Sequence, residues 1–336
     1  MSTPYKELSD RSFWSRAISS QNFLSFKDIY KKKFFIDKND KIVTAGSCFA
    51  QHIAHRLQES GYNYKNYEPP PPFMTESSAF HFNYTVYSAR YCNIYTARQL
   101  RQTFERAFNL REPEESVWSV PDGFIDPFRP IVEPEPFCSM EELNASRETH
   151  LQAVRKVFTE SDLFIFTFGL TEAWLAKKDG SVFPVCPGTR APWNKEHTLG
   201  IFDASKYEFK NFTFNEILED MRWLIENVRA KNPSVRFLFT VSPVPLVATA
   251  TGKHVLNATV YSKSTLRAVA GELSDQDKEI DYYPSYELVA SHPMRGAYFN
   301  PDLRTVDHAG VSQVMKYFFY EHCPHINNEQ VPPRNT

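Results

Sequence analysis

The segment from residue 41 to residue 61, KIVTAGSCFAQHIAHRLQESG, constrains the fold of this chain more than any other. It begins with an apolar run typical of a buried strand and breaks at Gly46. It then continues with apolar residues at the spacing of one helix face. Gly61 is placed to end that helix. The segment therefore predicts a buried strand, a tight turn and an amphipathic helix.

The alternation of strands and helices resumes later in the chain. The run LFIFTFG at residues 163–169 is typical of a fully buried parallel strand. Short buried strands that alternate with helices predict right-handed crossovers and a doubly wound parallel sheet, which is an α/β fold. Further strands are expected at 236–240 and 280–283, and helices at 97–110, 215–228, 259–273 and 311–319.

The 336 residues are expected to form one main domain, at residues 41–322. Its core can draw on 28 Phe, 17 Tyr and 5 Trp residues, which bury large surfaces. An N-terminal extension, residues 1–40, is expected to pack on this domain, and residues 323–336 form a C-terminal tail. Four consecutive prolines begin a region of about residues 69–155 that lacks regular alternation. We interpret that region as a large irregular insertion packed on the sheet.

Composition excludes several classes of protein. The formal net charge of −2 argues against a nucleic-acid partner. The five cysteines are scattered without a CxxC pair, which disfavours a disulfide scaffold and a cysteine-rich zinc site. No apolar run reaches the length of a membrane span, and no HExxH motif or carboxylate-rich loop indicates a metal. We therefore expect a cytoplasmic protein with reduced cysteines, no cofactor, no metal and no membrane insertion. The sequence does not determine its oligomeric state.

Ser47 lies at the edge of the predicted sheet where ligands bind. In parallel α/β sheets this is the edge outside the carboxyl ends of the strands. Ser47 also starts a helix, where unpaired backbone N–H groups and the helix dipole stabilise negative charge. A serine in that place is either a nucleophile or a helix cap, and this segment alone leaves both open. Four other segments are expected at the same edge: residues 169–172, 242–254 and 284–287, and the loop before the last helix.

A serine nucleophile needs a base, and the best is an imidazole oriented by a carboxylate. Of the ten histidines, two lie in loops that should reach the active edge. His254 follows the strand at 236–240, and His308 immediately precedes the last helix. The candidate carboxylates are Glu172, Glu287, Asp302 and Asp307.

Seven stretches of the chain, in order, resemble the GSCFA family, a branch similar to the SGNH (GDSL-type) hydrolases. They are AGSCFA at 45–50, NIYTARQL at 93–100, FTFGLTEAW at 166–174, FPVCPGT at 183–189, TVSPVPL at 240–246, YSKSTLRAVAGEL at 261–273 and YYPSYE at 282–287. The resemblance covers about residues 40–320. It implies a three-layer α/β/α sandwich with Ser47 as the nucleophile.

The resemblance also implies where an oxyanion would be held. In SGNH enzymes the donors are the serine N–H, a glycine of a second block and an asparagine of a GxND block. Here the second block falls near Asn93, whose amide suits that role. Threonine replaces the asparagine of GxND, and its hydroxyl can still donate one hydrogen bond. The candidate oxyanion and substrate-binding residues are Gly46, Cys48, Asn93, Gly169, Thr171 and Glu172.

The catalytic base departs from the SGNH pattern. The final SGNH block is DxxH, but Asp302 is followed three residues later by Thr305. Either His308 serves with a shifted loop and Asp302 as its partner, or the base is His254 oriented by Glu287. We favour His254, because its surroundings and the YYPSYE block resemble the family and those of His308 do not.

Together these features predict a serine-dependent ester hydrolase or O-acyltransferase. The resemblance implies an acylated sugar, or an intermediate of a bacterial surface or capsular polysaccharide, as substrate. The alternative is a non-catalytic glycan-binding or polysaccharide-assembly protein on a degenerate SGNH fold. A third interpretation gives Cys48 a role as a thiol with a lowered pKa at the helix start.

Overall fold

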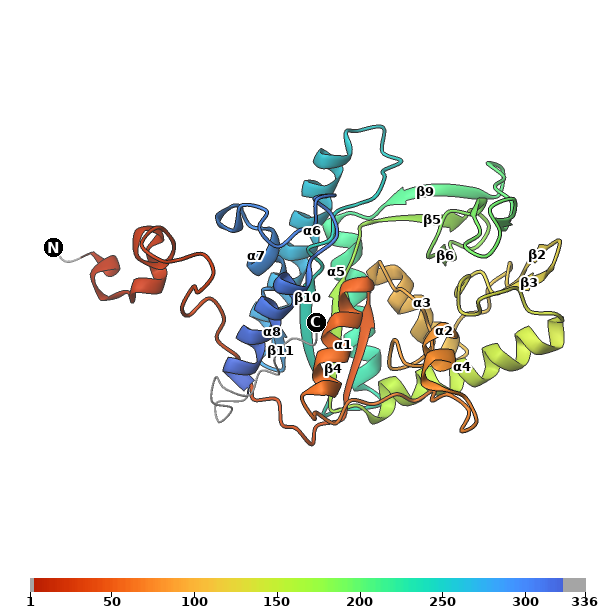
Figure 1. Cartoon of the computed structure of the whole chain (residues 1–336), viewed down its shortest axis with the longest axis horizontal. Coiled ribbons are helices and arrows are strands. Elements are labelled where there is room, and N and C mark those ends of the chain that lie inside the picture. Colours follow the sequence, from red (N-terminus) through yellow and green to blue (C-terminus); the bar gives the residue numbers. More distant parts are fainter. Residues whose placement is uncertain (1–2, 323–336) are drawn as a thin grey trace.

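A four-stranded parallel sheet forms the centre of the computed structural model, which describes residues 3–322. Its strands are β1 (Ile42–Gly46), β4 (Leu163–Phe168), β10 (Arg236–Val241) and β11 (Ile280–Tyr282). They are hydrogen-bonded in the order β1-β4-β10-β11, at the centre of the chain shown in Figure 1. Every residue of β1 and β4 is buried, as expected for strands of a covered parallel sheet. All the strands predicted from apolar runs are present.

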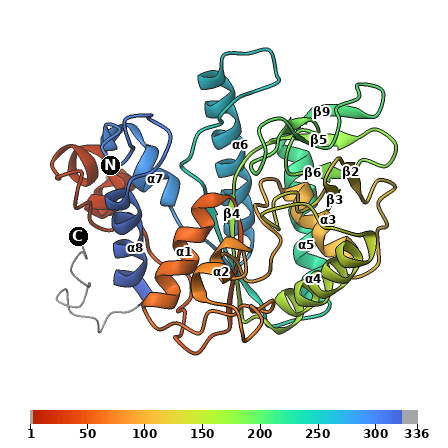
Figure 2. The same ribbon diagram turned by 45° about the vertical axis from the view of Figure 1, so that its right-hand side comes forward.

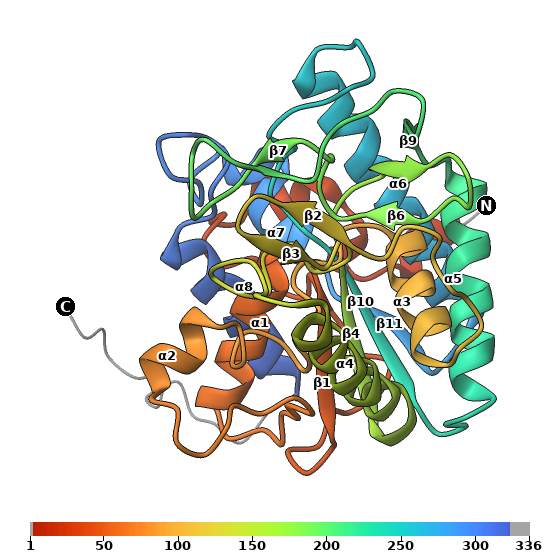
Figure 3. The same cartoon turned by 90° about the vertical axis from the view of Figure 1, so that its right-hand side faces the viewer.

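Helices cover both faces of this sheet, as Figure 3 shows. One face carries α1 (Cys48–Glu59), α7 (Ser285–Ala290) and α8 (His308–His322), and the other carries α3 (Ala97–Ala107), α4 (Met140–Glu160), α5 (Phe214–Arg229) and α6 (Val255–Gln276). Leu163 and Ile165 of β4 belong to the first core, whereas Phe164 belongs to the second. This is the period-two alternation of a strand. The predicted three-layer α/β/α sandwich is confirmed.

Phenylalanine side chains fill much of the core between the sheet and helices α3 to α6. Phe164 stacks on Phe158 of α4 with ring centroids 5.4 Å apart. Phe168 meets Phe239 edge to face at 5.5 Å. Each such pair contributes about 0.5–1.5 kcal/mol of stability beyond the hydrophobic gain from the area that it buries. The aromatic residues thus stabilise the layer that holds the strands in register.

Residues 69–155 lack βα alternation but contain regular elements. They include α2 (Glu76–His81), α3, most of α4, and a hairpin of β2 (Trp118–Val120) and β3 (Gly123–Ile125). Helix α3 packs against both α4 and α5. Part of this region is therefore an outer layer of the sandwich.

A second, antiparallel sheet begins where β4 ends. Its strands are β5 (Glu172–Ala176), β6 (Val182–Phe183) and β9 (Tyr207–Asn211), in the order β6-β5-β9. A short hairpin of β7 (Thr189–Arg190) and β8 (Thr198–Leu199) lies within the connection to β9. Figure 2 shows β5, β6 and β9 grouped away from α1 and α8. These strands lengthen the chain between β4 and α5 at the carboxyl edge of the central sheet.

The N-terminal extension divides into two parts. Three short helical turns, η1 (Pro4–Glu7), η2 (Asp10–Ser12) and η3 (Ser15–Ser19), have no buried residues and project from the body (Figure 1). After them, Phe26, Tyr30 and Ile36 are buried. The Tyr30 hydroxyl donates to Asp281 of β11 at 2.8 Å. The second part therefore packs against the central sheet.

Other predictions concern the end of the chain and membranes. The predicted tail, residues 323–336 with Cys323, lies outside the described residues. Helix α7 is followed by a short turn, η4 (His292–Met294), before α8. Within residues 3–322, no helix has the length and apolarity needed to cross a membrane.

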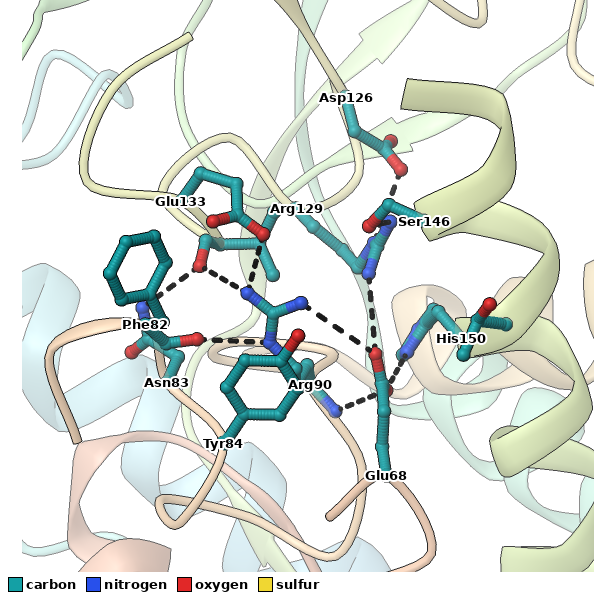
Figure 4. Close-up of polar contacts among 12 residues, drawn as sticks. Glu68, Phe82, Asn83, Tyr84, Arg90, Asp126, Arg129, Glu133, Ser146 and His150 are labelled. Atoms are coloured by element: carbon teal, nitrogen blue, oxygen red, sulfur yellow. Dashed lines mark hydrogen bonds and ion pairs between the residues drawn. The ribbon is translucent and has the colours of Figure 1, made fainter. Parts of the chain in front are cut away.

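A buried network of charges joins Glu68, which precedes the 69–155 region, to side chains of that region, among them His150 of α4 (Figure 4). Its centre is Glu68, which accepts the Arg90 backbone N–H at 2.8 Å and lies 2.8 Å from Nδ1 of His150. The Arg129 guanidinium lies 3.9 Å from Glu68. Burial alone would raise the pKa of Glu68, but His150 and Arg129 lower it below its usual value. Removing one partner of such a buried set costs about 3–5 kcal/mol.

Candidate functional site

Ser47 connects β1 to α1, at the predicted edge of the sheet. Its backbone is extended, with φ −78° and ψ −179°, and its carbonyl accepts the Ala50 N–H at 2.8 Å. Only 3% of the residue is exposed. Its Oγ forms no hydrogen bond within the described chain, and in particular none that caps α1. The capping interpretation is therefore not supported, and the hydroxyl is held at the helix start without a structural partner.

Two glycines fix the position of Ser47. Gly46 has φ +144°, and a Cβ there would lie 2.5 Å from the Thr167 carbonyl oxygen. A side chain at Gly46 would thus force β1 and β4 apart. At Gly169, a Cβ would lie 3.2 Å from the Cβ of Ser47 and 3.0 Å from the Tyr95 carbonyl oxygen. The structure brings Gly46, Ser47 and Gly169 together.

The segment after Asn93 lies between these glycines. The Ile94 N–H donates to the Gly46 carbonyl at 2.8 Å. The Tyr95 carbonyl in turn accepts the N–H of Gly169 at 3.1 Å. The Oδ1 of Asn93 accepts a hydrogen bond from the Tyr87 hydroxyl, which leaves the amide nitrogen as its donor. The predicted second block therefore lies next to the ends of β1 and β4.

Thr171 and Glu172 follow Gly169 but point to different neighbours. Thr171 is fully buried, and its hydroxyl has no hydrogen-bond partner among the described residues. Its backbone N–H donates to Ser262 of α6 at 3.1 Å. Glu172 instead accepts a hydrogen bond from Thr249 at 2.8 Å. Thr171 remains a candidate donor, whereas Glu172 holds the loop before α6.

The structure does not join His254 to Glu287. His254 is an exposed cap of α6, and its Nδ1 accepts the Leu256 N–H at 3.2 Å. Glu287 lies in the first turn of α7, where it accepts bonds from Arg267 at 2.5 Å and Tyr282 at 2.7 Å. Pro284 caps the start of α7, so the YYPSYE block ends inside a helix and not in a loop. This turns Glu287 toward Arg267 and Tyr282.

The alternative pair, His308 and Asp302, is not formed either. Asp302 accepts bonds from its own loop, at 2.9 Å from the Thr305 N–H and 2.6 Å from the Thr305 hydroxyl. His308 is exposed at the start of α8, with its Nδ1 3.4 Å from Ser312. Ser47 Oγ bonds to no imidazole within residues 3–322.

Lys263 is the residue near this site that sequence reasoning did not single out. It is 1% exposed, and its Nζ donates to the Gly169 carbonyl at 2.7 Å. Burial lowers its pKa from 10.5 to about 7; interaction with Cys48 opposes the shift, and Arg304 adds to it. A signal was present in the sequence, because Lys263 shares one helix face with Leu266 and Ala270. A lysine on the apolar face of a predicted helix is unusual.

Cys48 and Arg304 complete the surroundings. Cys48 is a free, exposed cysteine in the first turn of α1. The Nε of Arg304 is buried and makes no hydrogen bond to any described residue. In residues 3–322, no three His, Cys, Asp or Glu side chains are grouped closely enough to hold a metal ion. The site combines an alcohol, a thiol and two basic groups.

Comparison with known proteins identifies one family. The model of the GSCFA family matches residues 41–318, from the start of the first strand to α8. All the candidate residues above lie within this range. A search of curated proteins found no match to this chain.

Proposed function

Because the chain belongs to the GSCFA family and holds the Ser47 hydroxyl buried without a partner in its described part, we propose that it is a serine-dependent ester hydrolase or O-acyltransferase. The observation that carries this proposal is the Ser47 hydroxyl itself. A buried hydroxyl without a hydrogen bond costs about 1–3 kcal/mol. A catalytic role explains why the chain tolerates this cost, because a nucleophilic hydroxyl must be free to attack its substrate.

The start of α1 supplies the electrostatic part of this chemistry. First-turn N–H groups of a helix have no intrahelical carbonyl partner, and the dipole favours negative charge there. An ester carbonyl attacked by Ser47 would place its developing oxyanion near these groups. The Asn93 amide and the Thr171 hydroxyl are the side-chain donors that we assign to it. Water then releases the acyl group, or a sugar hydroxyl accepts it.

We infer an acylated sugar, or an acylated intermediate of a bacterial surface or capsular polysaccharide, as the substrate, from the family resemblance. Tyr87 and Tyr91 are 2% and 3% exposed and belong to the core. They therefore offer no exposed ring on which a sugar could stack. The cytoplasmic location expected from the sequence is part of the same proposal.

A second candidate is a glycan-binding or polysaccharide-assembly protein without catalysis. One observation favours it: neither of the expected base and carboxylate pairs, His254 with Glu287 or His308 with Asp302, is formed among the described residues. Such a protein would bind glycans without reacting at Ser47.

Labelling with a fluorophosphonate probe tests the proposal against this alternative. Mass spectrometry should find the probe on Ser47 in the wild type and nowhere in Ser47→Ala. Ser60→Ala, at the other end of α1, is the matched control and should label like the wild type. Cys48→Ala should also label, because the thiol is not the nucleophile in this account. A folded wild type that binds acylated sugars but never labels would make the binding protein the better account.

A further inference from the structure

Lys263 is a buried amine without an acidic partner. Its Nζ donates to one backbone carbonyl, that of Gly169, at 2.7 Å. Burial acts most strongly on its pKa, and the titratable groups that face it are Cys48 of α1 and Arg304 of the segment before α8. No carboxylate acts on it from the described chain. An ammonium ion buried without a counter-charge is costly, so the position favours the neutral amine.

The partner of Lys263 is also the residue that packs against Ser47. The Gly169 backbone accepts the Lys263 amine on one side, and a Cβ built on it would lie 3.2 Å from the Cβ of Ser47. Helix α6 and the β1–α1 turn thus meet at a single glycine. The side chain of lysine has four rotatable carbons, so its Nζ can exchange the Gly169 carbonyl for a neighbouring acceptor. Catalytic hydrogen bonds are often long in unliganded structures and tighten with substrate.

We propose that Lys263 accepts the proton of Ser47, in the place that the sequence led us to expect for a histidine. This inference rests on the proposed function of Ser47 and names the base that this function requires. Lysine serves as the base of a serine nucleophile on other, unrelated folds. Its family block, YSKSTLRAVAGEL, contains this lysine, which lies on the buried face of α6.

The step balances as an ordinary acyl transfer. The lone pair of the neutral Lys263 amine takes the proton as the Ser47 Oγ–H bond breaks. Oγ bonds to the ester carbon, and the carbonyl electron pair moves onto oxygen. When the tetrahedral intermediate collapses, the leaving alcohol takes the proton from the Lys263 ammonium. The acyl–Ser47 ester is then attacked by water or a sugar hydroxyl, whose proton goes to the same amine.

The pH dependence follows from the groups around the amine. Only the neutral amine can accept a proton, and the pKa of Lys263 is lowered to about 7. The reaction rate of Ser47 should therefore rise through neutral pH and level off above it. Arg304 favours the neutral form, and a thiolate at Cys48 would oppose it.

The experiment measures fluorophosphonate labelling of Ser47 from pH 5 to pH 10 in the full chain. Lys263→Met replaces the stem of lysine with an apolar side chain of similar length, and Lys263→Arg keeps the charge but cannot deprotonate. Lys177→Met is the matched control, because Lys177 donates to the Ala204 carbonyl at 2.7 Å but is exposed. We expect about 10²- to 10⁴-fold slower labelling in both Lys263 variants and no change in the control.

The outcomes are separable. If the wild type never labels at Ser47, the proposed function fails and this inference with it. If the wild type labels, and folded Lys263 variants label as fast with the same pH midpoint, Lys263 only satisfies the Gly169 carbonyl and is not the base.

Should neither variant fold, the wild type alone decides. The pH midpoint of its labelling should shift strongly with temperature, because the pKa of an ammonium group does. A weak shift, typical of a carboxyl group, would overturn the assignment. If Lys263→Ala folds, added ethylamine gives a separate test: it should restore labelling of Ser47, and a folded variant that labels as fast as the wild type without ethylamine would overturn the assignment.

Discussion

The Gly46→Ala variant tests the geometry that positions Ser47. The new methyl group would lie 2.5 Å from the Thr167 carbonyl oxygen and 2.9 Å from the Thr167 Cβ. Both contacts are within the neighbouring strand β4, so neither can be relieved by a flexible side chain. In addition, φ at Gly46 is +144°, in a region that L residues rarely adopt.

The expected cost has two parts. Backbone strain of this kind costs about 1–3 kcal/mol. Forcing an extra methyl group into a packed core costs about 1–3 kcal/mol more. Gly46→Ala should therefore lower the free energy of unfolding by about 2–6 kcal/mol, against a total of about 5–15 kcal/mol for a typical domain.

Gly61→Ala is the matched control. Gly61 also has a positive φ, +72°, but no described atom lies within 4 Å of a Cβ built there. Only the left-handed strain remains, about 1–2 kcal/mol. Urea unfolding followed by tryptophan fluorescence measures both variants. Equal losses of stability at Gly46 and Gly61 would show that β1 and β4 are not packed as described here, and would refute the reasoning.

Three further predictions follow from buried polar groups. Burial, and then Arg129, lower the pKa of His150 to about 4. The unfolded chain therefore binds the proton first, and stability falls as the pH drops from about 6.5 towards 4. Between pH 7 and pH 5 the loss due to His150 is roughly 2 kcal/mol, which urea unfolding should find in the wild type and not in His150→Gln. Glu68→Ala removes one carboxylate from the network of Figure 4 and leaves the Arg90 backbone N–H and His150 without their acceptor, although Glu133 and Asp126 still pair with Arg90 and Arg129. It should cost about 3–5 kcal/mol, while a change below 1 kcal/mol would contradict the ion-pair account. Thr171→Val removes a buried hydroxyl that has no described partner, so thermal unfolding should find equal or greater stability; a large loss would reveal a bond that the structure lacks.

The fold could be predicted because the strands carry their signal locally. The run LFIFTFG gave β4, and RFLFT gave β10, since a fully buried strand must be apolar along its length. Helix α4 was harder to find, because its buried face includes the polar His150. The residues that bury this side chain, such as Glu68, are distant in the sequence, so the periodicity within the helix cannot reveal them.

The candidate site could be predicted only in part. Ser47, Gly46 and Gly169 follow from the strand ends and from the family blocks. The partner of Glu287 does not, because it depends on how α6 packs in the fold, which brings Arg267 of α6 within 2.5 Å of Glu287 on α7. The same packing carries Lys263 to Gly169, although the two lie far apart in the sequence. A local pattern indicates which residue can do chemistry, whereas its partner is decided by the tertiary structure.

The most direct measurement is the capture of an acyl group on Ser47. The wild type is mixed with p-nitrophenyl acetate, quenched in acid within the first turnover, digested and analysed by mass spectrometry. The account predicts an acetyl ester on Ser47, in the peptide that contains GSCFA, and its absence from Ser47→Ala. Hydrolysis that continues in Ser47→Ala, or an acetyl group found on Cys48 instead, would contradict it.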